Sequence, residues 1–92
     1  MYVILVYDIC VDDKGKKNLP NVYKICKKYL VHIQNSVFEG EITEANLMKL
    51  REELKSYVRK DTDSVIVFKS RNSNWLEKMF WGKEDNKMDR FL

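Results

Sequence analysis

The chain opens with an apolar run that ends in a carboxylate. Both alternating faces of residues 2–7 are apolar, so residues 2–8 are predicted to form a strand that is buried on both sides. Residues 64–69 have the same two-faced apolar pattern and are predicted to form another such strand. Asp8 therefore lies where a charge is costly unless a metal ion, a helix N-terminus, a basic partner or solvent compensates it.

Two segments between these strands have the apolar spacing of amphipathic helices. We expect the first helix to begin at about Leu19, with Pro20 in its first turn, after a polar and lysine-rich loop over residues 12–18. The second helix is expected to begin after Thr43, whose hydroxyl can cap it, and to end before a turn at residues 61–63. Each helix has one apolar face that can pack against a sheet.

The remaining segments are predicted to be mostly extended. Residues 31–42 form either one strand or, in the interpretation we prefer, two short strands joined by a tight bend at residues 35–36. Residues 78–81 indicate a final short strand that Gly82 ends, although residues 74–80 are also compatible with the start of a helix. The order strand, helix, two strands, helix, strand is typical of the ferredoxin-like plan, an antiparallel sheet with both helices on one face.

We therefore predict an α+β fold, a ferredoxin-like βαββαβ domain over residues 1–82 with an extra C-terminal strand, and a tail over residues 83–92. The helices cover only one sheet face, whereas two of the strands are apolar on both. A second copy packed face to face, giving a homodimer, would cover the other face. The tail ends in the apolar pair Phe91 and Leu92 and is predicted to complete the partner subunit's sheet.

Composition narrows the function classes only a little. The 92 residues include 17 Lys plus Arg and 14 Asp plus Glu, so the net charge of +3 is too mild to indicate a nucleic-acid partner by itself. Cys10 and Cys26 are far apart and form no Cys-x-x-Cys pair, which argues against a zinc site and favours free thiols in a reducing cytoplasm. The apolar start is too short to cross a membrane and lacks a basic leader, so we expect a cytoplasmic protein without a membrane partner.

Asp8 and a set of lysines are the candidates for chemistry. By alternation Asp8 shares a face with Ile4 and Val6, so a face-to-face dimer would bring two copies of Asp8 together as a plausible Mg²⁺ site. The alternative is that Asp8 caps the turn after its strand. The lysines could make a basic surface for phosphates, or simply a solvated loop and helix face. They are Lys14, Lys16, Lys17, Lys24, Lys27 and Lys28.

Other catalytic constellations are not indicated. His32 is the only histidine and has no Ser, Cys or Asp partner by spacing, so it is expected to be a surface or satisfied strand histidine. Ser36 lacks the glycines of a nucleophile elbow. The glycines are scattered and form no phosphate-binding loop.

Three segments together resemble a known family. They are Val6-Tyr7-Asp8-Ile9, then Gln34-Asn35-Ser36-Val37-Phe38-Glu39-Gly40, and finally Asp63-Ser64-Val65-Ile66-Val67-Phe68. Their order and spacing resemble the Cas-two family of small CRISPR adaptation proteins, and the likeness extends over nearly the whole chain. The middle segment is the most specific of the three.

The resemblance implies a homodimer that bridges a larger CRISPR adaptation integrase and binds duplex DNA during spacer acquisition. It also implies a Mg²⁺-dependent endonuclease acting on single-stranded RNA or duplex DNA. In that account Asp8 binds the metal at the dimer axis, and Phe38 lies near the catalytic site. The family commonly has arginines where this chain has Lys14, Lys16 and Lys17, and lysine keeps the charge but loses the bidentate fork.

Three hypotheses about function follow. The chain is a metal-dependent phosphodiesterase, or a structural bridge that holds an integrase and DNA without cutting, or, apart from the resemblance, a small-molecule regulatory dimer. The last hypothesis predicts an apolar ligand pocket and no salt-sensitive binding to DNA.

Overall fold

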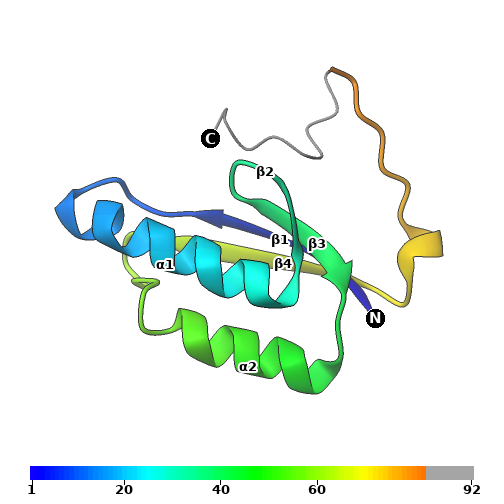
Figure 1. Cartoon of the computed structure of the whole chain (residues 1–92), viewed down its shortest axis with the longest axis horizontal. Coiled ribbons are helices and arrows are strands. Elements are labelled where there is room, and N and C mark those ends of the chain that lie inside the picture. The colour runs from blue at the N-terminus through cyan, green and yellow to red at the C-terminus, as the bar shows by residue number, and fades with distance from the viewer. Residues whose placement is uncertain (83–92) are drawn as a thin grey trace.

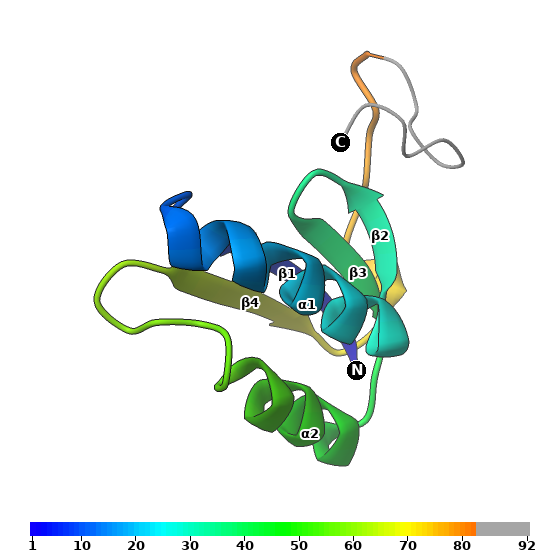
Figure 2. The same ribbon diagram turned by 60° about the vertical axis from the view of Figure 1, so that its left-hand side comes forward.

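The structure, a computed structural model, describes residues 1–82 of the chain and contains a four-stranded antiparallel sheet with two helices on one of its faces (Figures 1 and 2). The sheet order is β2-β3-β1-β4. The elements are β1 (Tyr2–Asp8), α1 (Asp13–Tyr29), β2 (Val31–Gln34), β3 (Val37–Glu41), α2 (Glu44–Leu54), β4 (Ser64–Ser70) and a short 3-10 helix η1 (Ser73–Trp75). This confirms the ferredoxin-like βαββαβ plan.

The central strand β1 pairs with β3 on one side and with β4 on the other. Leu5 lies opposite Phe38 of β3 and Val67 of β4, so all three side chains belong to the face that the helices cover. The alternate residues of β1 point to the other face. The hydrophobic core fills the space between the sheet and the helices; its fully buried large side chains are Phe38, Leu5, Leu50, Val3, Val22 and Cys26.

Helix α1 begins at Asp13, so the loop expected over residues 12–18 is wrong, as is the placing of Pro20 in the first turn. The Asp12 side chain caps the helix by accepting a hydrogen bond from the Gly15 backbone N–H at 2.8 Å. Gly15 packs so closely on the chain that an added Cβ would lie 1.7 Å from the Cys10 carbonyl oxygen. The buried residues of the first turns are thus glycine and asparagine, and a search for apolar spacing does not detect them.

The start of the second helix and the tight bend agree with the predictions, whereas the helix ends at Leu54, well before the turn at residues 61–63. The Thr43 side chain accepts a hydrogen bond from the Asn46 backbone N–H at 3.1 Å and caps α2. Asn35 has a φ of 41°, in the left-handed region that asparagine tolerates in turns, and it joins β2 to β3. Both cysteines are free thiols, Cys10 exposed and Cys26 buried.

The strand predicted at residues 78–81 is absent from the described part of the chain, and the alternative helix over residues 74–80 is limited to η1. A strand needs a neighbour to which it can hydrogen-bond, and within residues 1–82 this segment pairs with no strand of the sheet. Instead, Lys78 forms an ion pair with Glu39 of β3. The tail predicted to complete a partner's sheet, residues 83–92, lies outside the described residues.

The two faces of the sheet are covered very unequally. On the helix side, Val3, Leu5 and Tyr7 are buried. On the other side, Ile66 and Phe68 of β4 remain 51% and 59% exposed. The helices thus leave an apolar sheet face open, as the two-sided pattern of these strands predicted. No helix within residues 1–82 is long and apolar enough to cross a membrane.

Candidate functional site

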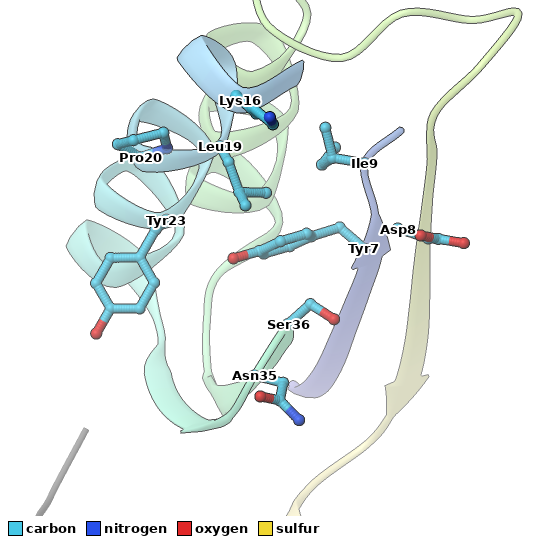
Figure 3. A pocket seen from close by; sticks show the side chains of 9 residues that line it. All are labelled: Tyr7, Asp8, Ile9, Lys16, Leu19, Pro20, Tyr23, Asn35 and Ser36. Atoms are coloured by element: carbon cyan, nitrogen blue, oxygen red, sulfur yellow. The ribbon is translucent and has the colours of Figure 1, made fainter. Parts of the chain in front are cut away.

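Asp8 is the last residue of β1 and lies opposite Ser64, the first residue of β4. Its side chain is exposed and points away from α1, whereas the neighbouring Tyr7 points toward that helix (Figure 3). Within residues 1–82, no group forms a hydrogen bond or ion pair with the Asp8 carboxylate. The chain after β1 is held by Asp12 and Asp63 instead, so Asp8 does not cap that turn.

The open face of the sheet carries an apolar patch that ends at Asp8. We define the open-face patch as Ile4, Val6, Ile66 and Phe68. Ile4 lies opposite Phe68 and Val6 opposite Ile66, so the four side chains form two neighbouring cross-strand pairs. Asp8 follows Val6 on the same face by alternation. The carboxylate therefore lies at the edge of an apolar surface that two sheets could share.

A hollow of about 500 Å³ lies at the same end of the sheet, between α1, the end of β1 and the β2–β3 turn (Figure 3). Lys16 is its basic lining residue, and Tyr23 lines it from the same helix. Burial, with smaller contributions from Cys26 and Tyr23, raises the pKa of Tyr7 to about 12, so this phenol stays protonated at neutral pH. The hollow lies on the helix side of β1, while the Asp8 carboxylate points to the other side.

All six predicted phosphate-binding lysines lie on α1 and are exposed. Their spacing places them around the side of the helix that faces away from the sheet. Two of them have partners within the molecule: Lys28 pairs with the Glu53 carboxylate, which raises the pKa of Lys28, and Lys27 donates a hydrogen bond to the Tyr23 hydroxyl at 3.4 Å. The structure thus brings the lysines together on one surface, and Lys16 is the one of them that lines the hollow at the end of β1.

Phe38 is not brought together with the Asp8 carboxylate. Its side chain is 0% exposed and lies on the helix side of the sheet, opposite Leu5. The ring packs in an aromatic cluster with Tyr7, Tyr23 and His32 at centroid distances of 6.0, 5.6 and 5.0 Å. His32 itself hydrogen-bonds through Nε2 to the Asn35 carbonyl oxygen at 2.8 Å, which agrees with a satisfied strand histidine.

The metal-binding capacity of a single copy is limited. Among the residues that the structure describes, no group of three or more His, Cys, Asp or Glu side chains gathers in a way that could hold a metal ion. Mg²⁺, however, usually keeps several waters and is bound through one or two carboxylates. An exposed carboxylate without a partner within residues 1–82 has the chemistry of such a ligand, and a second carboxylate would have to come from another molecule.

An ion-paired cluster close to Asp8 was missed in the sequence. Asp63 has a fully buried side chain and accepts hydrogen bonds from the backbone N–H groups of Cys10 and Arg59, both at 2.9 Å. The Arg59 guanidinium also bonds Asp63 at 3.2 Å, Asp12 at 2.9 Å and the Cys10 carbonyl at 3.2 Å. We call Arg59, Asp63 and Asp12 the loop clamp, because they tie the β1–α1 connection to the chain before β4.

The loop clamp keeps Asp63 ionised. Although burial opposes ionisation, the backbone N–H groups of Arg59 and Cys10 and the Arg59 guanidinium lower the pKa of Asp63 to about 2. In the sequence Asp63 appeared in a turn and as the first residue of the third resembling segment, without a predicted partner, and the N–H groups from which it accepts are 53 and 4 positions away. Apolar spacing carries no signal for such a contact.

Glu39 is a second residue whose position was not predicted. It lies in the most specific of the three resembling segments and is only 7% exposed, although it belongs to the open face. Lys78 pairs with it, and burial together with Glu39 raises the pKa of Tyr2 to about 12. The segment after η1 thus reaches back to the open face through Lys78.

A family model described as "CRISPR associated protein Cas2" matches residues 1–78 of the chain. A protein of Fusobacterium nucleatum, named "CRISPR-associated endoribonuclease Cas2", is 52% identical over 92 residues, all of this chain and 87% of that protein. A protein of Dictyoglomus turgidum with the same name is 39% identical over the full length of both chains.

Solved structures agree with these relatives. A "Crystal structure of cas2" superposes with a TM-score of 0.80 at 37% identity and covers 97% of this chain and 94% of the other. The structure of Streptococcus pyogenes Cas2 at pH 6.5 superposes with a TM-score of 0.74 at 29% identity, covering 87% of this chain and 99% of the other. Both matches have the antiparallel α+β arrangement described above.

Proposed function

Because the chain belongs to the CRISPR-associated Cas2 family, we propose that it is a CRISPR adaptation protein that cleaves nucleic acid at a Mg²⁺ site built on Asp8. The observation that carries the proposal is the position of Asp8, an exposed carboxylate without a partner within residues 1–82, at the edge of the open-face patch. The relatives' name, endoribonuclease, favours RNA as one substrate, with duplex DNA as the other. A bacterial or archaeal cytoplasm is the expected location.

The active form in this proposal is a homodimer that joins two open faces. Ile66 and Phe68 expose large apolar side chains that no element within residues 1–82 covers, and covering them with a second copy would remove that surface from water. In this dimer the two-fold axis passes beside the Asp8 end of the patch, so that each Asp8 approaches the Asp8 of the partner. The pair would then supply the two carboxylates that one copy lacks.

The chemistry assigned to this site is hydrolysis of a phosphodiester. A bound Mg²⁺ supplies charge neutralisation at the phosphate and lowers the pKa of a bound water. The Asp8 carboxylates would hold the ion, and Lys16 lies at the same end of the sheet, where it can attract a neighbouring phosphate. Phe38 would act as a positioning residue through its packing beneath Tyr7, since its ring lies on the other side of the sheet.

The outer surface of α1 is the proposed contact for duplex DNA while the protein acts together with the adaptation integrase. Lys14, Lys16, Lys17 and Lys24 are exposed there and attract phosphates regardless of sequence. Lys27 and Lys28 already contact Tyr23 and Glu53, so we expect them to contribute less. Lysines in place of the family's arginines retain the attraction but not bidentate geometry.

A second function, a structural bridge that cuts nothing, is favoured by the lack of any metal-binding cluster among the described residues of one copy. Both functions share the same dimer and the same lysine surface. The small-molecule regulatory hypothesis draws no support from the Cas2 relatives and is set aside.

The test is cleavage of single-stranded RNA and duplex DNA by the Asp8→Asn variant in the presence of Mg²⁺. An amide is a much weaker ligand for a hard cation than a carboxylate, so we expect cleavage of both substrates to be lost. Asp61→Asn is the matched control, because Asp61 is also exposed but lies in the turn before β4. The dimer and its affinity for DNA should persist in both variants, as measured by light scattering and by titration.

Persistence of wild-type cleavage in a rigorously purified Asp8→Asn sample would overturn the enzyme proposal. In that case the structural bridge would remain, provided that the variant still binds DNA and the integrase. Loss of cleavage in both variants would instead point to a general effect of charge.

A further inference from the structure

A groove lies between α2 and the edge strand β4, on the helix side of the sheet and away from the Asp8 carboxylate. In both views α2 lies next to α1 and is set apart from β4 (Figures 1 and 2). The groove has a volume of about 760 Å³. We call it the α2–β4 groove.

The floor of the α2–β4 groove is apolar. Leu47 and Leu54 of α2 face Val65 and Val67 of β4 across it, and Val58 closes the floor beyond the helix end. Met48 of α2 and Val67 of β4 remain 51% and 36% exposed. An apolar surface of this kind, framed by charged side chains, is typical of a site that another macromolecule covers.

The rim of the groove is basic. Arg51, Lys55, Lys60 and Lys69 line it, with Glu44 as the one acidic lining residue. Lys69 and Glu44 approach to 3.8 Å across one end, and Lys55 pairs with Glu52 at 2.8 Å. Arg51 and Lys60 form no salt bridge with any residue that the structure describes, so their charge is available to a partner.

We propose that the α2–β4 groove docks an acidic amphipathic helix of another protein. The apolar floor matches one face of such a helix, and its flanking carboxylates would meet Arg51 and Lys60. α2 has 11 residues, which corresponds to about 16 Å and thus to room for about three turns of a partner helix.

Two other occupants fit less well. A nucleic acid would use the basic rim but leave the floor of Met48 and Val67 without an apolar partner. A second copy joined by two-fold symmetry through this groove would bring its basic rim against the basic rim of the first copy. An acidic partner satisfies both the floor and the rim.

The experiment titrates the full chain with a fluorescein-labelled synthetic helix of about 16 residues, with leucines on one face and glutamates on both flanks. Two control peptides are a scrambled sequence of the same composition and a version with lysines in place of the glutamates. We expect the acidic amphipathic peptide to bind, the scrambled peptide to bind at least about fivefold more weakly, and the basic peptide not to bind. Amide NMR shifts should follow residues 47–55 and 65–69.

The variants distinguish the contributions of the apolar floor, the basic rim and the overall charge to peptide binding. R51E combined with K60E should weaken peptide binding by about tenfold or more, and Met48→Glu should weaken it through the floor. The matched control, K17E combined with K24E, makes the same change of net charge on α1 and should leave the affinity within about twofold. These side chains are exposed, and circular dichroism checks that each variant folds.

Three results would overturn the proposal. The first is a lack of specificity, seen either as equal binding of the acidic and scrambled peptides or as the same loss of peptide affinity in the α1 control as in R51E/K60E. The second is a fall in duplex DNA affinity for R51E/K60E that exceeds the fall for the α1 control, which would assign the rim to nucleic acid. The third is dissociation of the dimer by Met48→Glu, which would assign the floor to a second copy.

Discussion

Two aspartates at the same end of the sheet have opposite environments. Asp8 ends β1 and lies opposite Ser64, while Asp63 immediately precedes that serine. The Asp63 side chain is fully buried and accepts hydrogen bonds from two backbone N–H groups and from the Arg59 guanidinium. Asp8 is exposed and has no partner within residues 1–82.

The difference shows how a small fold separates structure from chemistry. Asp63 is ionised by a preformed set of donors, and its carboxylate has little capacity left for a ligand. Asp8 is positioned by the strand alone, and its lone pairs remain available. The loop clamp around Asp63 ties the chain that follows Asp8 to the chain before β4, and the Asp8 carboxylate takes no part in it.

Among the tests of this difference between Asp8 and Asp63, Phe68→Asp is expected to have the largest effect. If Asp8 depends on a second copy, a charge in the open-face patch should raise the dissociation constant of the dimer by about 100-fold or more and reduce cleavage as well. The unfolding of each copy should change little, because Phe68 is exposed in the single chain. Analytical ultracentrifugation and the cleavage assay measure the two effects.

Val11→Asp provides the control for that experiment, because Val11 is also an exposed apolar residue but lies outside the open-face patch. It should leave both the dimer and cleavage intact. A Phe68→Asp chain that is monomeric but fully active would show that Asp8 works without a partner.

The next effect concerns stability and separates the two aspartates directly. Asp63→Ala leaves the backbone N–H groups of Cys10 and Arg59 without their acceptor and should lower the free energy of unfolding by about 2–4 kcal/mol. Asp8→Ala removes no hydrogen bond or ion pair within residues 1–82 and should change the free energy of unfolding by less than about 0.5 kcal/mol. Urea unfolding at neutral pH measures both. Equal losses for the two variants would contradict the assignment of Asp63 as the structural member of the pair.

The smallest effect is a pH dependence confined to Asp63. Its folded-state pKa of about 2 lies below the ordinary value of 3.8, so the stability it contributes is complete above about pH 4 and is lost as the pH falls toward 2. The difference in unfolding free energy between wild type and Asp63→Asn should therefore shrink over this window. A difference in unfolding free energy that stays constant from pH 5 to about pH 2 would show that the ionised form of Asp63 does not provide this stability.

Much of the fold was predictable because it depends on local patterns. The two-sided apolarity of residues 2–7 and 64–69 identified β1 and β4 and also their uncovered face. Thr43 was recognisable as a helix cap, and its hydroxyl does cap α2. The end of β1 at Asp8 follows from the same pattern, so alternation alone is enough to locate the candidate carboxylate.

The predictions from sequence were wrong where contacts between distant residues, rather than local apolar spacing, determine the structure. α1 starts at Asp13 because Asp12 caps it and because Gly15 and Asn18, rather than apolar residues, face the interior. The Asn18 side-chain amide donates to the Tyr57 carbonyl at 3.1 Å, a contact between positions 39 residues apart. The strand expected at residues 78–81 needs a neighbour that no strand within residues 1–82 provides.

Local sequence patterns were sufficient to predict the order of the elements, the two apolar faces of β1 and β4 and the carboxylate at the end of β1, because alternation and helical spacing are properties of neighbouring residues. Only the tertiary structure decided that Asp63 and Arg59 clamp the chain beside Asp8, that Phe38 lies on the opposite side of the sheet from it, and that α2 and β4 enclose a groove. These features depend on which distant segments meet, and close packing and hydrogen bonds to buried groups decide that.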